Sequence, residues 1–589
     1  MTARTPSQTR PLLLIWLAGC AIFIIASWSH ITGLSGWDPD DQLRMVQLRD
    51  FLGGQGWFDN SQQRLNAPYG APMHWSRVTE LPLALIVLLL SPIFGQAIAE
   101  MIAGTAVPLL LLGLTGWLLC DIARRVGQAS AAPIAMILCL VTATIIAQFM
   151  PMRIDHHGWQ IMLASLSLWT LFRTGGRSSS ILLGAALALW LHISLEGAPL
   201  VAAFFVWLGW QWIFSKLHGA RLLPSICSFA GVSFALFFAT EKAALSAPIW
   251  CDNMSPAHLV AIAAAAIIMI PATLFNARHW QIRMAMAAMA GGAAIISMLW
   301  FAPECSGGAF AQLDPLVRNY WYVNVTEGLP LWQQVSISAA SWLMPAIMAL
   351  IGLFLLHRRK DILVSAHANV TAFFMIVSFL IALLVFRAAS VACAFAIPVL
   401  ANWLAVMIEQ YRSSEAPMRK MKLALSIMAI VLAGPIFAQL ANGVSAATSS
   451  GPTQNHTSTE VKNRLCQSAK SVKSLTGLPT GRIVATFDMS PAILLTTGHS
   501  VLASSHHRNK AGMRDQIRLF ASSPDKAGQI VFARGITHFV ICPDEAEMRQ
   551  YLLRDPDGLW ARLAKNDIPK WLQPMPDMGE GIKIWRVVR

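Results

Sequence analysis

The stretch Trp37-Asp38-Pro39-Asp40-Asp41-Gln42-Leu43-Arg44 places three carboxylates in four residues, just beyond the first membrane-length apolar run, residues 12–30. Clustered carboxylates at a membrane boundary are costly unless they face water, a cation or a polar partner. A second polar cluster, Asp155-His156-His157, follows another apolar run. The expected topology brings both clusters to one side of the membrane. Converging oxygen and imidazole groups favour a divalent-metal site, and therefore an enzyme.

The composition is that of a polytopic membrane protein. The 589-residue chain is 55% apolar and 13% charged, with a mean hydropathy of +0.53, whereas about a quarter of a soluble domain is charged. Windows of about 18–20 apolar residues recur, and each is long enough to cross a bilayer as a helix. The net charge of +14 comes from short basic loops between these runs. That placement indicates the positive-inside bias and not nucleic-acid binding.

The basic loops predict a thirteen-span helical bundle with a cytoplasmic N-terminus. The loops that fall on one side carry Arg124-Arg125, Arg173 with Arg177, Lys216 with Arg221, Arg278 with Arg283, Arg358-Arg359-Lys360, and Arg412 to Lys422. The transmembrane domain, residues 1–442, then has external segments at 31–97, 151–156 and 303–336. The apolar run 81–94 is too short for a span, so we expect it along the membrane or inside the bundle. The spans are expected at 12–30, 98–120, 131–150, 157–173, 179–195, 198–215, 222–240, 257–276, 284–302, 337–356, 362–386, 389–410 and 422–442.

Beyond the bundle, residues 443–459 form a polar Gly/Ser/Thr-rich linker. Residues 460–589 have the composition of a soluble domain, which would be periplasmic. Helix-like stretches at 510–521 and 545–553 alternate there with short apolar runs, and this alternation predicts a small α/β domain. The runs lie at 482–487, 500–504, 529–533, 537–542 and 582–588.

The nine cysteines include no CxxC pair, which argues against a structural zinc site of cysteines. Cys251 and Cys305 fall at the external ends of successive spans, and Cys466 and Cys542 both lie in the C-terminal domain. Each pair is either a disulfide, if the compartment is oxidising, or two buried free thiols. The sequence leaves both alternatives open.

Each polar cluster also has a purely structural interpretation. Asp38 is a favoured helix N-cap and Pro39 suits the first helical position. Asp40 and Asp41 could be solvated first-turn charges that the helix dipole favours. Against this, Asp155 and His157 stand two residues apart, a spacing that lets both chelate one ion from a turn. Such a mixed ligand set suits manganese or a similar ion better than calcium.

A third motif indicates a family. In the segment 303–336, Asn324-Val325-Thr326-Glu327, followed by Pro330 and Trp332, resembles the S-V-x-E-x-x-P-x-x-W segment in the catalytic subunit of oligosaccharyltransferases, which are GT-C-type membrane glycosyltransferases. Residues 38–44 resemble that family's D-P-x-x-x-x-R motif, and residues 155–157 resemble its D-H-H motif. The motifs share the family's order and topology, and the likeness covers roughly residues 12–410.

The resemblance implies a role for each matching residue. Asp38, Asp155 and His157 correspond to the ligands of Mn²⁺ or Mg²⁺, and Asp38 also faces the acceptor. Glu327 corresponds to the loop glutamate that completes the acceptor or metal site. Arg387 is the candidate for binding the donor phosphate, although its spacing to Pro398 departs from the family pattern and it could instead snorkel to the interface. Further candidate substrate-binding residues in the same region are Asp40, Asp41, Arg44, His156 and Glu196, and His192 is a polar residue that either lines the cavity or bonds inside the bundle.

One departure from the family bears on the acceptor. Residues 443–589 contain no match to the W-W-D-Y-G motif with which the family reads its acceptor sequon. Fold and donor chemistry are therefore expected to transfer, and protein N-glycosylation is not. The domain offers other polar groups, which either bind an anionic substrate group or form a solvated loop: His499, His506, His507, Arg508 and Asn509.

These observations together predict a metal-dependent inverting glycosyltransferase of the inner membrane of a bacterial-type cell. Its donor would be a sugar or glycan on a polyprenyl phosphate, because nucleotide sugars are absent outside the cytoplasm. Its acceptor would be a lipid, glycan or protein of the cell envelope. The alternative is a secondary transporter or flippase of lipid-linked glycans, which also needs many spans. Transporters place functional charges near the bilayer midplane, however, whereas these clusters lie at the external boundary.

Overall fold

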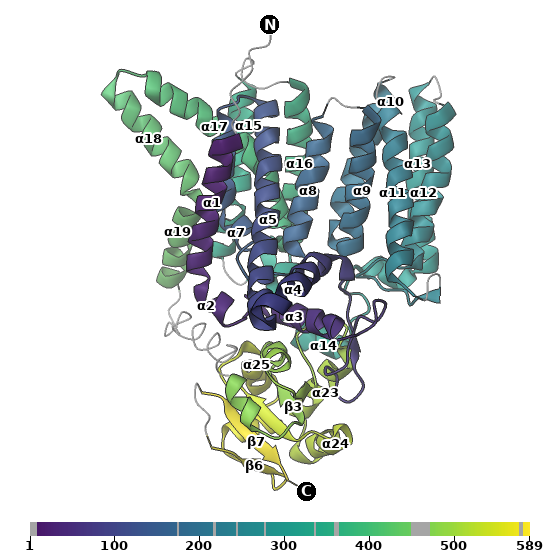
Figure 1. Ribbon diagram of the computed structural model, residues 1–589, viewed down its shortest axis with the longest axis vertical. Coiled ribbons are helices and arrows are strands. Elements are labelled where there is room, and N and C mark those ends of the chain that lie inside the picture. Colours follow the sequence, from purple (N-terminus) through teal and green to yellow (C-terminus); the bar gives the residue numbers. More distant parts are fainter. Residues whose placement is uncertain are drawn as a thin grey trace.

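The computed structural model describes residues 9–173, 176–215, 219–242, 246–275, 279–334, 337–358, 365–448, 472–576 and 581–588. Two parts are evident in Figure 1: a bundle of long helices, and a smaller C-terminal domain (residues 472–588) that packs against one end of the bundle. Of the expected linker, residues 443–448 are the end of a helix, α19 (Ala433–Thr448). Its remainder and Cys466 lie outside the described residues.

Within these residues, ten helices are long and apolar enough to cross a membrane, or eleven if a bent pair counts as one span. The expected number of thirteen is therefore not confirmed. Two expected spans are short: α6 (Ala131–Val141), followed by α7 (Ala143–Ile146), and α8 (His157–Leu171). The bent pair is α18 (Pro417–Val431) with α19, at an angle of 71°. The long helices are α1 (Thr9–Ala26), α5 (Gln96–Val126), α9 (Gly176–Ile193), α10 (Ala198–Phe214), α11 (Gly219–Thr240), α12 (Pro256–Phe275), α13 (Trp280–Phe301), α15 (Met344–His357) with the 3₁₀ segment before it (Ile337–Leu343), α16 (Ser365–Leu384) and α17 (Ala389–Ser413).

Composition explains which helix is central. The spanning window of α17 is 89% buried, and that of α13 only 6%. The alanines of α17 let neighbouring backbones approach closely, as small residues do between membrane helices. In α13, by contrast, large apolar side chains such as Ile295 and Trp300 remain exposed. Helix α17 is therefore the core of the bundle, and α13 lies at its edge.

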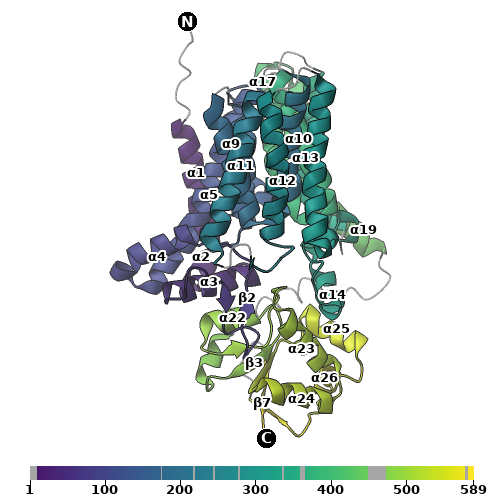
Figure 2. The same cartoon turned by 90° about the vertical axis from the view of Figure 1, so that its right-hand side faces the viewer.

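Between bundle and C-terminal domain lies the juxtamembrane segment, residues 31–97. Its elements are α2 (Trp28–Thr32), which begins just before it, α3 (Pro39–Leu52), the antiparallel pair β1 (Ser61–Gln62) and β2 (Ala71–Pro72), and α4 (Leu81–Phe94). Helix α3 lies across the end of the bundle, and α4 projects sideways from it (Figure 2). The short apolar run at 81–94 thus lies outside the bundle, with only Leu83, Ala84 and Val87 of α4 buried.

The C-terminal domain is α/β, as expected. Its sheet has the order β4-β3-β5-β7-β6. Strands β4, β3 and β5 are parallel to one another, and β7 is antiparallel to both of its neighbours, β5 and β6. The apolar run 529–533 is part of a helix, however, because Pro524 at its start and Gly535 in the left-handed conformation at its end mark helix boundaries. The strands are β3 (Arg482–Ala485), β4 (Ser500–Val501), β5 (His538–Ile541), β6 (Leu572–Pro574) and β7 (Lys583–Val587); the helices are α22 (Ser490–Thr496), α23 (Lys510–Ala521), α24 (Pro524–Arg534), α25 (Ala546–Arg554) and α26 (Leu559–Ala564).

The two faces of this sheet belong to different cores. Side chains alternate along a strand, so Ile483 and Ala485 of β3 face α22, while Val484 between them faces α23 and α24. The first face continues without a break into α3 and α5, where Leu43 and Ala103 belong to the same buried cluster. The C-terminal domain therefore shares a hydrophobic core with the juxtamembrane segment.

Polar contacts reinforce this junction. Arg49 of α3 binds Glu100 of α5 at 2.7 Å and donates to the carbonyl of Leu495 at 2.8 Å. Arg64 donates to the carbonyls of Leu494 and Thr497. The C-terminal domain is thus fixed to the bundle by backbone acceptors as well as by apolar packing.

Candidate functional site

The acidic motif forms the start of α3. Asp38 is the N-cap, and its Oδ1 accepts the N–H of Asp41 at 3.0 Å, while Asp41 Oδ2 accepts the N–H groups of Trp37 and Asp38. This reciprocal capping box satisfies N–H groups that a helix start leaves unpaired. The capping interpretation of Asp38 is therefore correct, and Asp38 also lines the cavity described below.

Asp41 is a buried residue, 1% exposed, and not a solvated first-turn charge. Its Oδ1 accepts the backbone N–H groups of Ile154 at 2.9 Å and Asp155 at 3.0 Å. The side chain therefore fixes the second motif to the first.

Arg153 neutralises this pair of carboxylates. Its Nη1 contacts Asp38 Oδ2 and lies 2.9 Å from Asp41 Oδ2. The guanidinium is buried, and both side chains accept hydrogen bonds from it, as a buried cation requires. One oxygen of Asp38 thus caps α3, and the other faces a cation.

The second motif is buried and tied to Arg44. Arg44 donates to Asp155 Oδ1 at 2.7 Å and to His156 Nδ1 at 3.0 Å, and its guanidinium stacks on Trp75. Although burial opposes ionisation, His156, His157 and Arg44 hold the pKa of Asp155 well below its usual range. Asp155 is therefore a carboxylate at neutral pH.

Arg387 joins the third motif to this network. It lies in the 3₁₀ turn Phe386–Ala388 before α17 and forms ion pairs with Glu196 and with Glu327. Gln160 of α8 donates to Glu196 Oε2 at 3.1 Å and lies 3.3 Å from His157 Nδ1. Polar contacts thus run without a gap from the segment 303–336, the glutamate loop, to Asp155, His156 and His157, the Asp155 cluster.

A cavity of about 370 Å³ lies where these groups meet. The bundle, the glutamate loop and the C-terminal domain all contribute to its wall, and the last two are joined by Tyr320, whose hydroxyl donates to Asp555, and by Gln550, which donates to Asn324. Half of the lining residues carry charged or imidazole side chains: Asp38, Asp40, His74, His156, Glu196, Asp252, Glu327, Arg387, Asp488, His506, His507, Glu545 and Glu547.

Asp40 faces this cavity and is only partly exposed. Burial and the negative charges of Asp155 and Glu327 raise the pKa of Asp40 to about 8. Asp40 is therefore largely protonated at neutral pH, and neither Asp40 nor Asp41 is the solvated first-turn charge that one interpretation expected.

The residues of the second motif fit a metal ion. Ligating atoms of Asp155, His156 and His157 lie within 4.8 Å of one another. Asp155 Oδ2 is buried without a hydrogen-bond partner and lies 3.2 Å from His157 Nε2. Two such ligands, each about 2.1 Å from one ion, are separated by about 3.0–3.4 Å. Asp38 is not part of this group among the described residues. Its Oδ1 caps α3, and its Oδ2 contacts Arg153.

The polar residues expected in the C-terminal domain separate into three groups. His506 and His507 line the cavity, whereas Arg508 binds Asp252 through Nε at 2.9 Å and Nη2 at 2.8 Å. His499 accepts the N–H of Gly481 inside the domain, and Asn509 is buried at the start of α23. His192 is buried in the bundle, 3.4 Å from the hydroxyl of Thr240.

This arrangement does not favour anion binding by the histidines. Burial, followed by the neighbouring His507, lowers the pKa of both His74 and His506 well below its usual value. Asp252 already balances the charge of Arg508. The imidazoles of His74 and His506 are therefore neutral.

Sequence reasoning missed several residues of this region. Arg153 stands two residues before Asp155, and an arginine at an external boundary was a signal that could have been followed. Gln160, one turn after His156 on α8, was a second signal. No local pattern marks His74 or Asp252, because their partners are more than 250 residues away in the sequence.

No protein-family model matches the chain, and no curated protein matches it in sequence. Solved structures do match. Those of the oligosaccharyltransferase AglB from Archaeoglobus fulgidus include its complex with an inhibitory peptide and a dolichol-phosphate, with a TM-score of 0.65 at 12% identity over 97% of this chain and 73% of that chain.

Two further structures of the same archaeal enzyme match. Its complex with Zn and sulfate has a TM-score of 0.57 at 13% identity, over 90% of this chain and 67% of that chain. The form tethered to an acceptor peptide with the NVT sequon has a TM-score of 0.62 at 12% identity, over 99% and 74%. At such identities the likeness concerns the fold. The chain therefore has the GT-C fold of the archaeal oligosaccharyltransferase, in agreement with the resemblance of its motifs.

Proposed function

We propose that this protein is a metal-dependent, inverting glycosyltransferase of a bacterial inner membrane. It transfers a sugar or glycan from a polyprenyl-phosphate-linked donor to a lipid, glycan or protein acceptor of the cell envelope, on the periplasmic side. The observation that carries the proposal is the meeting of Asp38, Glu327 and Arg387 on one cavity next to the Asp155 cluster. The archaeal neighbour, solved with a dolichol-phosphate and in another structure with Zn, supports the donor class and the metal.

Asp155 and His157 are the residues that would hold the ion, and Asp38 would join them when its outer oxygen leaves Arg153. A bound divalent cation supplies Lewis-acid stabilisation of the negative charge on a leaving phosphate. Mn²⁺ and Mg²⁺ both suit the oxygen ligands, and the imidazole favours Mn²⁺.

Arg387 is the protein's own cation for the donor phosphate. Its two carboxylate partners are both at the cavity, so a phosphate can replace one of them without removing the arginine from its position. Arg387 holds the pKa of Glu327 below its usual value. Release of Glu327 from Arg387 therefore makes the carboxylate more basic, as an acceptor-orienting group requires.

In the reaction, the acceptor oxygen attacks the anomeric carbon from the face opposite the phosphate. The bond between that carbon and the phosphate oxygen breaks, and its electron pair stays with the phosphate. The acceptor proton passes to the carboxylate of Asp38 or Glu327. One direct displacement inverts the anomeric centre, and Arg387 stabilises the charge that develops on the phosphate.

The test uses Asp38→Asn in the purified protein in detergent, with a lipid-linked sugar donor and envelope lipids as acceptors. Asparagine is as good an N-cap as aspartate, so α3 keeps its start while the charge is lost. We expect product formation to fall by orders of magnitude with unchanged expression and monodispersity. Asp567→Asn, at a carboxylate that is 64% exposed, is the matched control.

Undiminished turnover in Asp38→Asn would remove Asp38 from the catalytic groups. No turnover of any lipid-linked donor by the wild type would favour the transporter, because detergent leaves no compartments between which a substrate could be moved. A mass comparison of envelope lipids and glycans with and without the gene identifies the acceptor.

A further inference from the structure

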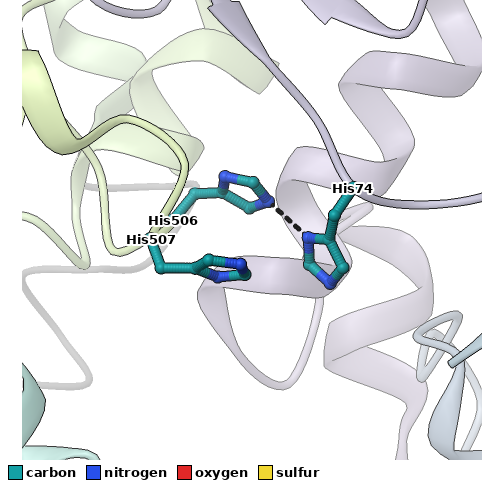
Figure 3. Close-up of side chains that lie close together, drawn as sticks. All are labelled: His74, His506 and His507. Atoms are coloured by element: carbon teal, nitrogen blue, oxygen red, sulfur yellow. Dashed lines mark hydrogen bonds between the residues drawn. The ribbon is translucent and has the colours of Figure 1, made fainter. Parts of the chain in front are cut away.

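Three histidines from two distant parts of the chain meet at the cavity wall. His74 follows β2 in the juxtamembrane segment, and His506 and His507 follow β4 in the C-terminal domain. Figure 3 shows the three rings close together, with His74 Nδ1 and His506 Nε2 2.8 Å apart. One ring nitrogen from each residue lies within 4.8 Å of the others.

The surroundings of this cluster, His74 with His506 and His507, resemble those of metal-bound imidazoles. Asp252 Oδ2 contacts Nε2 of His507, and metal-bound histidines commonly donate their second N–H to such a carboxylate. That bond fixes the proton on Nε2 and leaves the lone pair of Nδ1 for an ion.

Asp252 is itself held in place. Arg508 binds both of its oxygens and stacks on Trp250, with 4.1 Å between the guanidinium carbon and the ring centroid. The preceding residue, Cys251, forms a disulfide with Cys305, which joins the ends of α12 and α13. Asp252, the carboxylate that contacts His507, is therefore held in position, as a residue that orients a metal ligand needs to be.

We propose that His74, His506 and His507 form a second metal site, separate from the Asp155 cluster, for a transition ion of the Zn²⁺ type. Imidazole nitrogen is a ligand that suits zinc, and three protein ligands leave one position open. All three histidines line the cavity, so the open position faces the space in which a substrate binds. The ion also connects the juxtamembrane segment to the C-terminal domain.

The two sites adjoin. The rings of His74 and His156 meet edge to face, with 6.3 Å between their centroids. The sites differ in their ligands, because the Asp155 cluster contains a carboxylate and the His74 cluster contains three imidazoles. Hard ions such as Mg²⁺ prefer oxygen, so the His74 cluster selects Zn²⁺ or Co²⁺ over Mg²⁺.

The experiment measures metal binding and needs no donor, so its outcome is independent of the proposed transferase activity. Full-length protein in detergent is stripped with a chelator and titrated with Co²⁺, whose visible absorption reports the coordination geometry, and then with Zn²⁺ as competitor. The double variant Asp155→Asn/His157→Gln removes the other site and leaves the histidine cluster intact. We expect this variant to bind one Co²⁺ per chain with a tetrahedral-type spectrum that Zn²⁺ abolishes.

Variants of the cluster are made in that double-variant background. His74→Gln and His506→Gln, on separate segments, should each weaken Co²⁺ and Zn²⁺ binding by about 100-fold or more, because each removes one of three ligands. Asp252→Asn should weaken it by about 10–100-fold. His279→Gln, at an exposed histidine before α13, is the control for adventitious binding and should change nothing.

A double variant that binds no Co²⁺ would overturn the proposal, and the histidines would then be a hydrogen-bonded contact only. Equal affinity in His74→Gln, His506→Gln and their parent would overturn it as well. Thermal midpoints provide a second readout on the same samples. Zn²⁺ should raise the midpoint of the double variant and of His279→Gln, and leave that of His506→Gln unchanged.

Discussion

Asp41 is the residue on which the relative position of the first two motifs depends. Its carboxylate accepts four backbone N–H groups, those of Trp37, Asp38, Ile154 and Asp155, and pairs with a buried arginine. Asp41→Ala removes all of these acceptors at once. The N–H groups of Ile154 and Asp155 then stay buried without a partner, and Arg153 keeps only Asp38 as a counter-charge.

The magnitude follows from these contacts. Leaving a buried hydrogen-bond donor without an acceptor costs about 1–3 kcal/mol, and the N–H groups of Ile154 and Asp155 are two such donors. Each 1.4 kcal/mol is a factor of ten in an equilibrium. A loss of about 3 kcal/mol in local stability therefore makes opening of the segment 153–157 more frequent by about 100-fold. Amide hydrogen exchange reports such opening directly, so we expect exchange of the Ile154 and Asp155 amides to accelerate by at least about that factor.

The assay is hydrogen–deuterium exchange with mass spectrometry on the protein in detergent, resolved to the peptide that contains residues 150–157. Asp40→Asn is the matched control, since it removes a carboxylate from the same turn of α3 and leaves the acceptors of Ile154 and Asp155 intact. Exchange in this peptide that is the same in Asp41→Ala and in the wild type would refute the reasoning. Acceleration of equal size in Asp40→Asn would refute it too.

Three further predictions concern the cavity and the acceptor. Arg387→Ala should reduce product formation by about 100-fold or more, because the leaving phosphate loses its protein cation, while Arg562→Ala at an exposed ion pair should have no effect; an unchanged rate in Arg387→Ala would assign the phosphate to another cation. Burial, aided by Asp488, raises the pKa of Glu547 to about 8, so the native state binds more protons than the unfolded state between about pH 4.5 and 8. Its contribution to stability then falls as pH rises through that window, and the fall in thermal midpoint measured from pH 5 to 9 should be smaller in Glu547→Gln; equal slopes would contradict this. Incubation with an Asn-x-Ser/Thr peptide and a lipid-linked donor should yield no glycopeptide by mass spectrometry, and a glycosylated asparagine would show that the W-W-D-Y-G motif is dispensable here.

The sequence predicts what depends on periodicity and on local motifs. Membrane-length apolar runs gave the helical bundle, and alternating short runs gave the α/β region. The GT-C fold followed from three short motifs in order, which neither a family model nor a sequence relative supports. Local pattern also identified the N-cap Asp38, because a cap and its first turn are adjacent in sequence.

The residues that the sequence did not predict correctly are those whose partners are distant in the sequence. Asp41 resembles a surface charge in its own helix, and only Ile154 and Asp155, more than 110 residues later, make it a buried acceptor. Nothing near His74 in the sequence marks it as a site residue, because its partner His506 lies 432 residues later. The number of thirteen spans stays a prediction, because α6, α7 and α8 lie where spans were expected and are each shorter than a typical membrane-crossing helix.

The junction between the juxtamembrane segment and the C-terminal domain has a consequence for biosynthesis. Arg49 and its acceptor Leu495 are 446 positions apart, so at about 5–20 residues per second the segment emerges roughly 20–90 s before its partner. During that interval α3 exposes apolar side chains that the finished protein buries. We therefore expect the nascent chain to need a holding chaperone at this point, and the cavity wall to close only after residues 472–588 have been made. Premature termination before residue 472 would leave the apolar side chains of α3 and α5 uncovered and the bundle prone to aggregation, so closure of the cavity depends on synthesis of the C-terminal domain.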